Sequence, residues 1–360
     1  MIQGLKRLHL IHYRWILAIT LVIFVTVGVV LFGIDSKSAE QAVTKATQYK
    51  LLVMARASAR STERMLAMFK LELTVLERKE EIKNQNIVGT RNLLTNVLTT
   101  VNLPIVHQLG LVSKDGTLLV IANKEGKITG QGDSLVDRKY FQWAKTAKEG
   151  EFFLSEPIIG RAGSNKDKWV VVLITPIIDK SGNFNGGLFA SIRLEDLTTG
   201  YIDVLKVTPT TVGYVINENG IVLSGQPEDL VGSNIKEYAQ KEKWKRYETY
   251  INVIDQIAKK EEGVGDYYFA GVDKKVERWI TGYAPAQVDG DTIMIIIAVP
   301  FEWTLGLIAD FYKNQIIWLI FLIVIGSLIA FFWISGLYLA RYDGYNHGLK
   351  DGANFKKGKD

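Results

Sequence analysis

The stretch "LGLVSKDGTLLVIA", residues 109–122, indicates the fold most clearly, because it reads as two β-strands joined by a turn. The dipeptide Asp115–Gly116 lies between two apolar runs, and Asp-Gly is a strong signal for a tight hairpin. About a hundred residues later, "GYVINENGIVLSG", residues 213–225, has the same layout around Asn219–Gly220. When the two turns are aligned, apolar residues match apolar residues on both sides. The chain therefore contains two copies of one antiparallel unit.

The second halves of the two units also correspond. Residues 170–192 and residues 278–300 each read as a strand that ends near a proline, a turn and a second strand. Shorter helices are expected between the halves, at 137–148 in the first unit and at 235–260 in the second. A period of about 105 residues is too long for a solenoid repeat. We therefore expect two PAS-like modules in tandem, each built on an antiparallel sheet.

A long helix is expected before the modules. No Gly or Pro occurs between Ser36 and Ile87, and apolar residues recur at helical spacing from Leu66 to Leu76. The pattern predicts one helix over residues 36–83 and a second helix over residues 88–102.

Two apolar runs without a charged residue flank this region, at 15–34 and 316–340. A helix needs about 20 apolar residues to cross a hydrocarbon core of about 30 Å, so both runs are long enough to span a membrane. Trp15 and Trp318 lie near their ends, where amphipathic rings prefer the headgroup level. A buried core helix is the alternative interpretation, but such helices are rarely apolar on every side over this length.

The basic residues predict the orientation of the two spans. The formal net charge is +5, and it lies entirely in the two ends of the chain. Lys6, Arg7 and Arg14 precede the first span without any acid, and five basic residues against three acidic ones follow the second span. By the positive-inside rule both termini are cytoplasmic, and the middle of the chain lies outside the cytoplasm. The charge is thus a topology signal, and we expect no nucleic acid as a partner.

The first span has a second interpretation as a cleaved signal peptide. Its apolar region is longer than the roughly 7–15 residues usual for a signal peptide, which favours an uncleaved anchor. We therefore expect a two-pass protein of the cell (plasma or inner) membrane.

These features predict an α+β protein with a long N-terminal helix and two tandem PAS-like antiparallel-sheet modules, flanked by two transmembrane helices. The expected boundaries are a cytoplasmic N-terminus at 1–14, a transmembrane helix at 15–34, the long stalk helix and second helix at 35–103, a membrane-distal module at 104–205, a membrane-proximal module at 206–312, a transmembrane helix at 315–340 and a cytoplasmic tail at 341–360.

The order of elements resembles the double Cache (dCache) sensor ectodomains of bacterial transmembrane receptors, over roughly residues 36–312. The sharpest local match is "DRKYFQWAKTAKEGEFFLSEPIIGR", Asp137 to Arg161, which looks like the Cache pattern of Arg-x-Tyr-Phe followed by a Ser-x-Pro strand. The stretch from Thr175 to Ile192 looks like the strand that closes the distal module. The resemblance implies that the distal module holds a small ligand and that binding is passed to the cytoplasm. The second module has no counterpart of the Arg-x-Tyr-Phe segment, so we expect it to be a spacer.

A subset of the family binds amino acids with Arg, Trp and Tyr at the carboxylate and acidic residues at the ammonium. Arg138 matches the arginine, and Tyr140 and Phe141 fall at the aromatic places. The acidic positions fall on Gly160 and Ser191, which cannot pair with an ammonium. The resemblance therefore argues against an amino-acid sensor of the usual kind.

Read physically, the same stretch is a candidate site for a carboxylate. Arginine presents planar paired donors, and nearby aromatic rings give a small-ligand pocket its apolar walls. We expect Arg138 and Phe141 to be neighbours one turn apart on a helix. The structural alternative is that the rings only pack this helix on the sheet and that Arg138 pairs with Asp133, Asp137 or Glu156. The candidate ligand-binding residues are Arg138, Tyr140, Phe141, Trp143, Ser155, Trp169 and Ser191.

An enzymatic function has little support in the sequence. The chain has no cysteine, and His107 is the only histidine between the two spans. A metal site or a Ser-His-Asp arrangement would therefore have a single candidate histidine, and we interpret His107 as structural. No nucleotide-binding glycine motif occurs. We expect no catalytic residues, no metal and no cofactor.

The tail after the second span has twenty residues with four glycines, and we expect no stable structure in it. It has no room for an output domain. We therefore interpret the chain as a sensory receptor subunit that binds a small extracellular solute, possibly a carboxylate, and signals through a membrane-embedded or cytoplasmic partner, with a homodimer expected. A truncated fragment of a longer receptor is also compatible. The alternative function is a non-sensory envelope protein that uses its modules for adhesion or assembly.

Overall fold

The computed structural model describes residues 2–100, 106–194, 196, 208–225, 230–270, 275–288, 291–306 and 309–357. The chain divides into two compact units, Met1–Val43 with Leu305–Asp360, and Thr44–Thr304. The boundaries expected at 103/104 and at 205/206 lie outside the described residues.

The smaller unit contains the two apolar helices. Helix α1 (Ile2–Glu77) supplies its first part and helix α9 (Ala309–Lys357) its second part. Both helices are long and apolar enough to cross a membrane. Side chains such as Trp318, which is 64% exposed, cover their outer surface. Apolar side chains on the outer surface are compatible with surrounding lipid. The backbone N–H and C=O groups are also satisfied there, because a helix pairs them within itself.

The two helices of this unit lie side by side. The Tyr312 hydroxyl donates a hydrogen bond to the Ser36 carbonyl at 3.1 Å. A Cβ placed on Gly28 would lie 3.2 Å from the Leu319 side chain, so the absence of a side chain there permits the close approach.

The segment after the second span is helical, and the expectation of an unstructured tail is wrong as far as Lys357. Helix α9 continues from the span to Lys357 without a break, while residues 358–360 lie outside the described residues. The unfavourable step in forming a helix is its nucleation, and the span has already nucleated this one. Each added residue then gains a backbone hydrogen bond, which offsets the poor helix propensity of the glycines.

The long helix also differs from the expectation. Helix α1 begins far before residue 36, in one piece with the first span, and it ends at Glu77. Lys79 is extended (φ −70°, ψ 136°), and a separate short helix α2 (Glu80–Lys83) follows. This turn buries Ile82 completely. No Gly or Pro lies at the break between α1 and α2. We therefore attribute the change in chain direction to the burial of the Ile82 side chain.

Glu77, the last residue of α1, carries a carboxylate that is buried beneath the first sheet. Its side chain is 2% exposed, and its Oε2 accepts a hydrogen bond from the Thr175 hydroxyl at 2.7 Å. Its Oε1 has no hydrogen-bond partner among the described residues. Burial raises the pKa of this carboxyl above its ordinary value, while the Thr175 hydroxyl opposes the shift.

Replacement of Glu77 by glutamine should therefore change how stability depends on pH. Because the folded-state pKa is raised, the protonated form stabilises the fold at low pH, and this contribution is lost as pH rises from the ordinary glutamate value through the raised pKa. The Glu77→Gln protein should gain on the wild type as pH increases from about 4 to 8. Denaturant unfolding of both proteins across this range tests this, and a constant difference would contradict it.

The first module is a six-stranded antiparallel sheet. Its strands follow the order β2-β1-β6-β5-β3, with β4 also paired to β5. The strands are β1 (Val106–Ser113), β2 (Leu118–Asn123), β3 (Phe153–Leu154), β4 (Ile158–Ile159), β5 (Trp169–Ile178) and β6 (Phe184–Arg193). The expected Asp115–Gly116 hairpin joins β1 to β2, with Gly116 at φ +87°.

The second module has the same strand order. Its five-stranded sheet runs β8-β7-β11-β10-β9. The strands are β7 (Val212–Asn217), β8 (Val222–Gly225), β9 (Gly263–Ala270), β10 (Val276–Val288) and β11 (Asp291–Pro300). Each first hairpin has a register shift, between Leu111 and Val112 in one and between Val215 and Ile216 in the other. These positions are equivalent when the two hairpin turns are aligned. The two modules therefore share the position of the register shift as well as the strand order.

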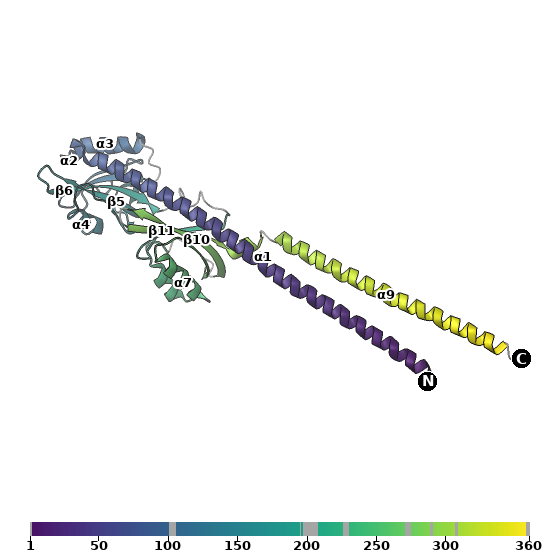
Figure 1. Ribbon diagram of the computed structural model, residues 1–360. Helices are drawn as coiled ribbons and strands as arrows, with labels where there is room; N and C mark the ends of the chain where they lie inside the picture. Colours follow the sequence, from purple (N-terminus) through teal and green to yellow (C-terminus); the bar gives the residue numbers. More distant parts are fainter. Residues whose placement is uncertain are drawn as a thin grey trace. The chain divides into compact units, whose positions relative to one another are not determined.

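Helices cover both faces of each sheet (Figure 1). Residues 44–77 of α1 pack along both sheets, and α3 (Ile87–Thr100) joins it on the first. The opposite faces carry α4 (Lys139–Ala144) in the first module and α6 (Ile235–Glu242) with α7 (Tyr247–Ile257) in the second. A short helix, α8 (Phe301–Gly306), follows β11.

Two of the expected helices have different lengths in the structure. The helix expected at 137–148 is only α4, six residues long. The helix expected at 235–260 is divided into α6 and α7, because Lys243 and Arg246 adopt left-handed backbone conformations (φ 45° and 65°).

Candidate functional site

Arg138 lies immediately before helix α4 and not within it. Its backbone is extended (φ −77°, ψ 127°) and the helix begins at Lys139, so Arg138 is the N-cap residue, and its carbonyl accepts a hydrogen bond from the Phe141 N–H at 3.0 Å. The Nη2 of Arg138 donates a hydrogen bond to the Ile159 carbonyl at 2.9 Å. Its Nε is buried and has no partner among the described residues. The guanidinium is thus anchored by one backbone contact and keeps unused donors.

Tyr140 lies beside this arginine in the first turn of α4. The side chain is 4% exposed, and its ring centroid lies 6.4 Å from that of Phe189. Burial raises the pKa of the hydroxyl to about 12, although the charges of Arg138 and Arg161 act to lower it. The hydroxyl is therefore neutral at physiological pH and available as a hydrogen-bond donor.

Phe141 and Trp143 serve the packing of α4. Phe141 is 1% exposed and meets the Phe184 ring edge-to-face at 6.0 Å. Trp143 stacks on Phe153 with ring centroids 5.4 Å apart. Neither residue lines any of the three cavities described below.

The remaining candidates come from the strands and are held by internal contacts. The Ser155 hydroxyl donates to the Glu156 carbonyl at 2.8 Å and accepts from the backbone N–H of Val172 at 2.9 Å. Ser191 is 3% exposed and accepts a hydrogen bond from the Asn165 amide at 2.9 Å. Trp169 is 40% exposed, and its ring lies over Gly232 of the second module.

Three cavities meet at Arg138. The first, which we call the inner cavity, lies within the first module between α4, the sheet and the loop of residues 157–168, and has a volume of about 30 Å³. The second, the inter-module cleft, has about 480 Å³ and is lined by both modules. The third, the outer groove, is an open depression of about 600 Å³ that also contacts Trp169.

The inner cavity is lined by polar groups although it is small. Arg138, Tyr140 and Ser191 from the candidate set line it, together with Gln108 and Asn165. The Gln108 Oε1 is buried without a hydrogen-bond partner among the described residues, as is the Arg138 Nε. A volume of about 30 Å³ is the share of one water molecule, so binding of a larger solute requires the surrounding loop to move.

The loop of residues 157–168 forms one wall of the inner cavity. Ala162 to Asn165 of this loop, including the short 3₁₀ helix η1 (Gly163–Asn165), are buried. Arg161 donates two hydrogen bonds to the carboxylate of Asp137, at 2.6 and 2.5 Å. This exposed ion pair connects the loop to the residue preceding Arg138.

A polar network behind the cavity was not among the sequence candidates. The Arg193 Nε donates to the Asn165 Oδ1 at 2.7 Å, and its Nη2 donates to the Ser164 carbonyl and to Glu125, each at 2.8 Å. Hydrogen bonds from Lys127 and then Arg193 lower the pKa of Glu125 to about 2. The sequence signal that could have identified Arg193 is the alternation of side chains along a strand. Alternation places Arg193 and Ser191 on the same face of β6 as the buried Phe189.

Gly160 and Ser191, the two positions where amino-acid sensors carry acids, both line the inner cavity. A Cβ at Gly160 would lie 2.1 Å from the Asn165 carbonyl oxygen, so a larger residue does not fit there without moving the loop. The inner cavity therefore lacks a carboxylate at either position.

His107 contacts an acid at the end of the first module. Its Nε2 lies 3.0 Å from the Asp196 Oδ2. Burial lowers the pKa of the imidazole, and the charge of Asp196 opposes that shift. Among the residues that the structure describes, no three His, Cys, Asp or Glu side chains gather in a metal-binding group.

The face of the second sheet covered by α6 and α7 is filled by aromatic rings. Trp244 meets Phe269 edge-to-face at 5.3 Å, and Tyr250 lies 5.1 Å from Tyr267 and 5.4 Å from Phe269. These rings pack α6 and α7 against the second sheet as part of its buried core.

Comparison with known proteins identifies the architecture. The family model of the Cache domain (dCache_1) matches residues 36–311. No curated protein matches the chain.

Solved structures with the same fold include sensory domains of bacterial chemoreceptors. The periplasmic sensory domain of the Campylobacter jejuni chemoreceptor Tlp1 aligns with 17% identity and a TM-score of 0.56, covering 73% of this chain and 98% of that domain. The ligand-binding domain of the Pseudomonas aeruginosa amino-acid chemoreceptor PctB, in complex with L-Gln, aligns with 15% identity and a TM-score of 0.54, covering 74% and 96%. That of the Pseudomonas fluorescens chemoreceptor CtaA, in complex with L-serine, aligns with 14% identity and a TM-score of 0.52, covering 72% and 99%.

Proposed function

This chain belongs to the Cache-domain family in its double (dCache) form, and on that premise we propose that it is a sensory receptor subunit that binds a small carboxylate solute at Arg138 in its first module. The single observation that carries the proposal is the state of Arg138. Its Nε is buried without a partner, and no ion pair to it occurs among the described residues. A guanidinium whose buried Nε has no acceptor is a costly arrangement that a bound anion would relieve.

The neighbouring acids are engaged elsewhere, which supports this role. Asp137 pairs with Arg161, and Glu156 pairs with Lys139 at 3.3 Å. These two pairings support a role in which Arg138 is not neutralised by an acid among the described residues. A carboxylate could accept paired hydrogen bonds from the guanidinium and a third from the neutral Tyr140 hydroxyl.

Binding in this manner requires the loop of residues 157–168 to open the inner cavity. The loop is held over it by the Arg161–Asp137 pair and by Asn165 on Ser191. Both members of the ion pair are well exposed, and such pairs contribute roughly 0–1 kcal/mol. Opening the loop also breaks the buried hydrogen bonds of Arg193 to Asn165 and to the Ser164 carbonyl, so the bound solute would have to offset their loss.

The remaining parts of the proposal concern the membrane. Both termini are cytoplasmic, in keeping with the positive ends of the chain, and the modules face the extracytoplasmic side. The subunit forms a homodimer, and a shift of the modules on α1 is passed through the spans to a membrane-embedded or cytoplasmic signalling partner.

A second candidate function is a non-sensory envelope protein that uses the modules for adhesion or assembly. The observation that favours it is the small volume of the inner cavity, about 30 Å³. The two functions differ in whether the module responds to a solute.

Thermal unfolding of the full chain in lipid nanodiscs against a library of small solutes decides between them. A solute at one hundred times its Kd stabilises the protein by about 2.7 kcal/mol, and the larger unit should then unfold several degrees higher. At least one carboxylate should produce this shift. If a broad library of carboxylates shifts nothing, the envelope function is the better description.

A further inference from the structure

A row of side chains on three neighbouring strands lines the inner cavity. Gln108 of β1 pairs with Ser191 of β6, and Ser191 pairs with Val172 of β5, so the three lie next to one another on one face of the sheet. All three line the inner cavity. Directly opposed residues of an antiparallel pair have Cβ atoms about 4.5–5.5 Å apart, so a small solute in this cavity lies within reach of the whole row.

Gln108 contributes an unused acceptor to this row. The residue is 3% exposed, and its Oε1 has no hydrogen-bond partner among the described residues. A Cβ at Gly163 would lie 1.9 Å from this oxygen, so the glycine of the loop of residues 157–168 leaves room for it. A buried carbonyl oxygen without a donor is a costly arrangement, and a hydroxyl of a bound solute would relieve it.

The other side chains that could bind a solute in the inner cavity are donors. The Arg138 Nε has no acceptor among the described residues, and the Tyr140 hydroxyl is neutral. The Ser191 Oγ accepts from the Asn165 amide at 2.9 Å, and its own hydrogen can be donated to a solute. The Asn165 Oδ1 already accepts from Arg193 at 2.7 Å. These groups suit a carboxylate, which only accepts hydrogen bonds.

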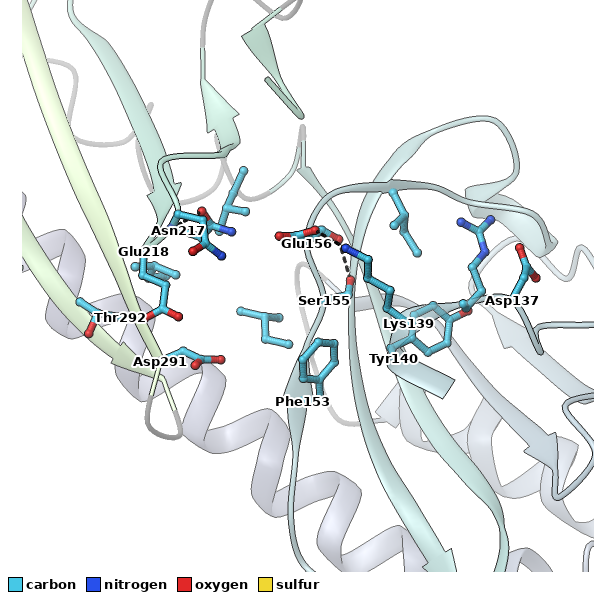
Figure 2. Close-up of a pocket in the computed structure, with 16 residues that line it drawn as sticks. Asp137, Lys139, Tyr140, Phe153, Ser155, Glu156, Asn217, Glu218, Asp291 and Thr292 are labelled. Carbon is cyan, nitrogen blue, oxygen red and sulfur yellow. Dashed lines mark hydrogen bonds and ion pairs between the residues drawn. The ribbon is translucent and has the colours of Figure 1, made fainter. Parts of the chain in front are cut away.

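No aspartate or glutamate lines the inner cavity among the residues that the structure describes. Asp137, the acid nearest to Arg138 in sequence, is engaged in an ion pair. Glu218 and Asp291 line the inter-module cleft and not the inner cavity, and Figure 2 shows them on the far side of that cleft from Tyr140. An ammonium in the inner cavity would therefore lie beside Arg138 without a carboxylate to offset the repulsion.

Given the carboxylate site of the proposed function, on which this inference rests, we propose that the inner cavity selects 2-hydroxycarboxylates. The carboxylate binds Arg138 and Tyr140, and the 2-hydroxyl donates to the Gln108 Oε1 and accepts from Ser191. Because the cavity holds only about 30 Å³ before the loop moves, the two polar groups of the solute must be close together, which places the hydroxyl on the carbon next to the carboxylate. Apolar side chains such as Val172 suit a short aliphatic remainder.

Three acids with the same carbon skeleton test the proposal on the full chain in nanodiscs. Each enantiomer of lactate has a hydroxyl next to the carboxylate, propionate has a hydrogen there, and L-alanine has an ammonium. Isothermal titration should show one lactate enantiomer binding at least about tenfold more tightly than the other two acids. Propionate leaves the Gln108 oxygen unpaired, and alanine places a cation beside Arg138. Equal affinities of lactate and propionate, or no binding of lactate, would overturn the proposal.

The variant Gln108→Met assigns the preference to one side chain. Methionine keeps most of the side-chain volume, and removal of an unpaired buried acceptor should not destabilise the fold. Lactate affinity should fall about tenfold, to that of propionate, while propionate affinity should change by less than about twofold. Retained propionate binding shows that the variant is folded. If Gln108→Met still prefers lactate, Gln108 does not recognise the hydroxyl and the proposal is wrong.

Gln142→Met is the matched control. Gln142 is an exposed glutamine of α4 whose amide donates to the Val136 carbonyl, and it lines none of the three cavities. Its replacement should leave the affinities for lactate and propionate unchanged. An equal loss of lactate affinity in Gln142→Met and Gln108→Met would contradict a specific contact at Gln108.

The outcomes separate hydroxyl recognition from the proposed function. If propionate binds as tightly as lactate and Arg138→Met weakens both, the carboxylate site stands and only recognition of the hydroxyl is refuted. If lactate, propionate and every other carboxylate fail to bind, the proposed function is refuted as well.

Discussion

Arg138→Met is expected to weaken binding of a carboxylate solute by about 10- to 100-fold. Hydrogen bonds to charged groups contribute about 1.5–3 kcal/mol, and each 1.4 kcal/mol corresponds to about a factor of ten in affinity. Methionine retains much of the side-chain volume but no donor, so α4 and the Ile159 strand should keep their positions. Isothermal titration of the strongest carboxylate found in the solute library measures the effect.

Two further variants make this result specific. Arg138→Lys keeps the charge without the planar pair of donors, and it should lose less affinity than Arg138→Met. Arg56→Met removes an arginine from an exposed ion pair with Glu262. Neither residue lines any of the three cavities, so this variant should leave affinity within about twofold. If Arg138→Met binds the carboxylate as well as the wild type does, the proposed clamp is wrong.

Gly282→Ala is expected to lower the stability of the larger unit by about 3 kcal/mol, near the upper end of overpacking effects. Gly282 lies on β10 where α1 crosses the second sheet, and a Cβ there would lie 2.2 Å from the backbone nitrogen of Leu52 and 2.4 Å from the Leu51 carbonyl carbon. Backbone atoms cannot turn away as a side chain can, so helix and sheet must separate. Leu51, which is 1% exposed, would lose part of its packing.

Thermal unfolding measures the consequence of Gly282→Ala. A loss of about 3 kcal/mol should lower the midpoint by about 6–12 °C for a unit of this size. Gly306→Ala is the control, since a Cβ at Gly306 meets nothing within 4 Å. If the two variants unfold at the same temperature, the close approach of α1 to the second sheet is not as described.

Much of the fold could be predicted because its signals are local. The turn at Gly116 requires a positive φ, as does the turn at Gly220, and the apolar runs around each turn define the strand pairs. The matching of the two halves then predicts the common strand order.

The errors in the predicted fold arose where tertiary contacts decide the local structure. Helix α1 ends after Glu77, where the burial of Ile82 in the core redirects the chain, and no Gly or Pro lies near that break. The division between α6 and α7 depends on Lys243 and Arg246 in conformations that non-glycine residues rarely adopt.

The candidate site was predictable to the extent that a single short motif carries it. Arg138 and Tyr140 lie next to one another in sequence, and both line the inner cavity. The Asn165–Arg193 pair joins residues that are 28 positions apart, and the cleft joins Phe153 to Glu218 and Asp291 from the other module. No local pattern brings such residues together, so only the folded arrangement reveals them.

Hydrogen–deuterium exchange of the full chain, with and without a saturating carboxylate, tests the central claim most directly. If the solute binds at Arg138 and the loop closes over it, protection should increase in residues 157–168 and in the segment around α4, with little change on α6 and α7. Protection confined to the second module, or an unchanged loop of residues 157–168, would contradict solute binding at Arg138.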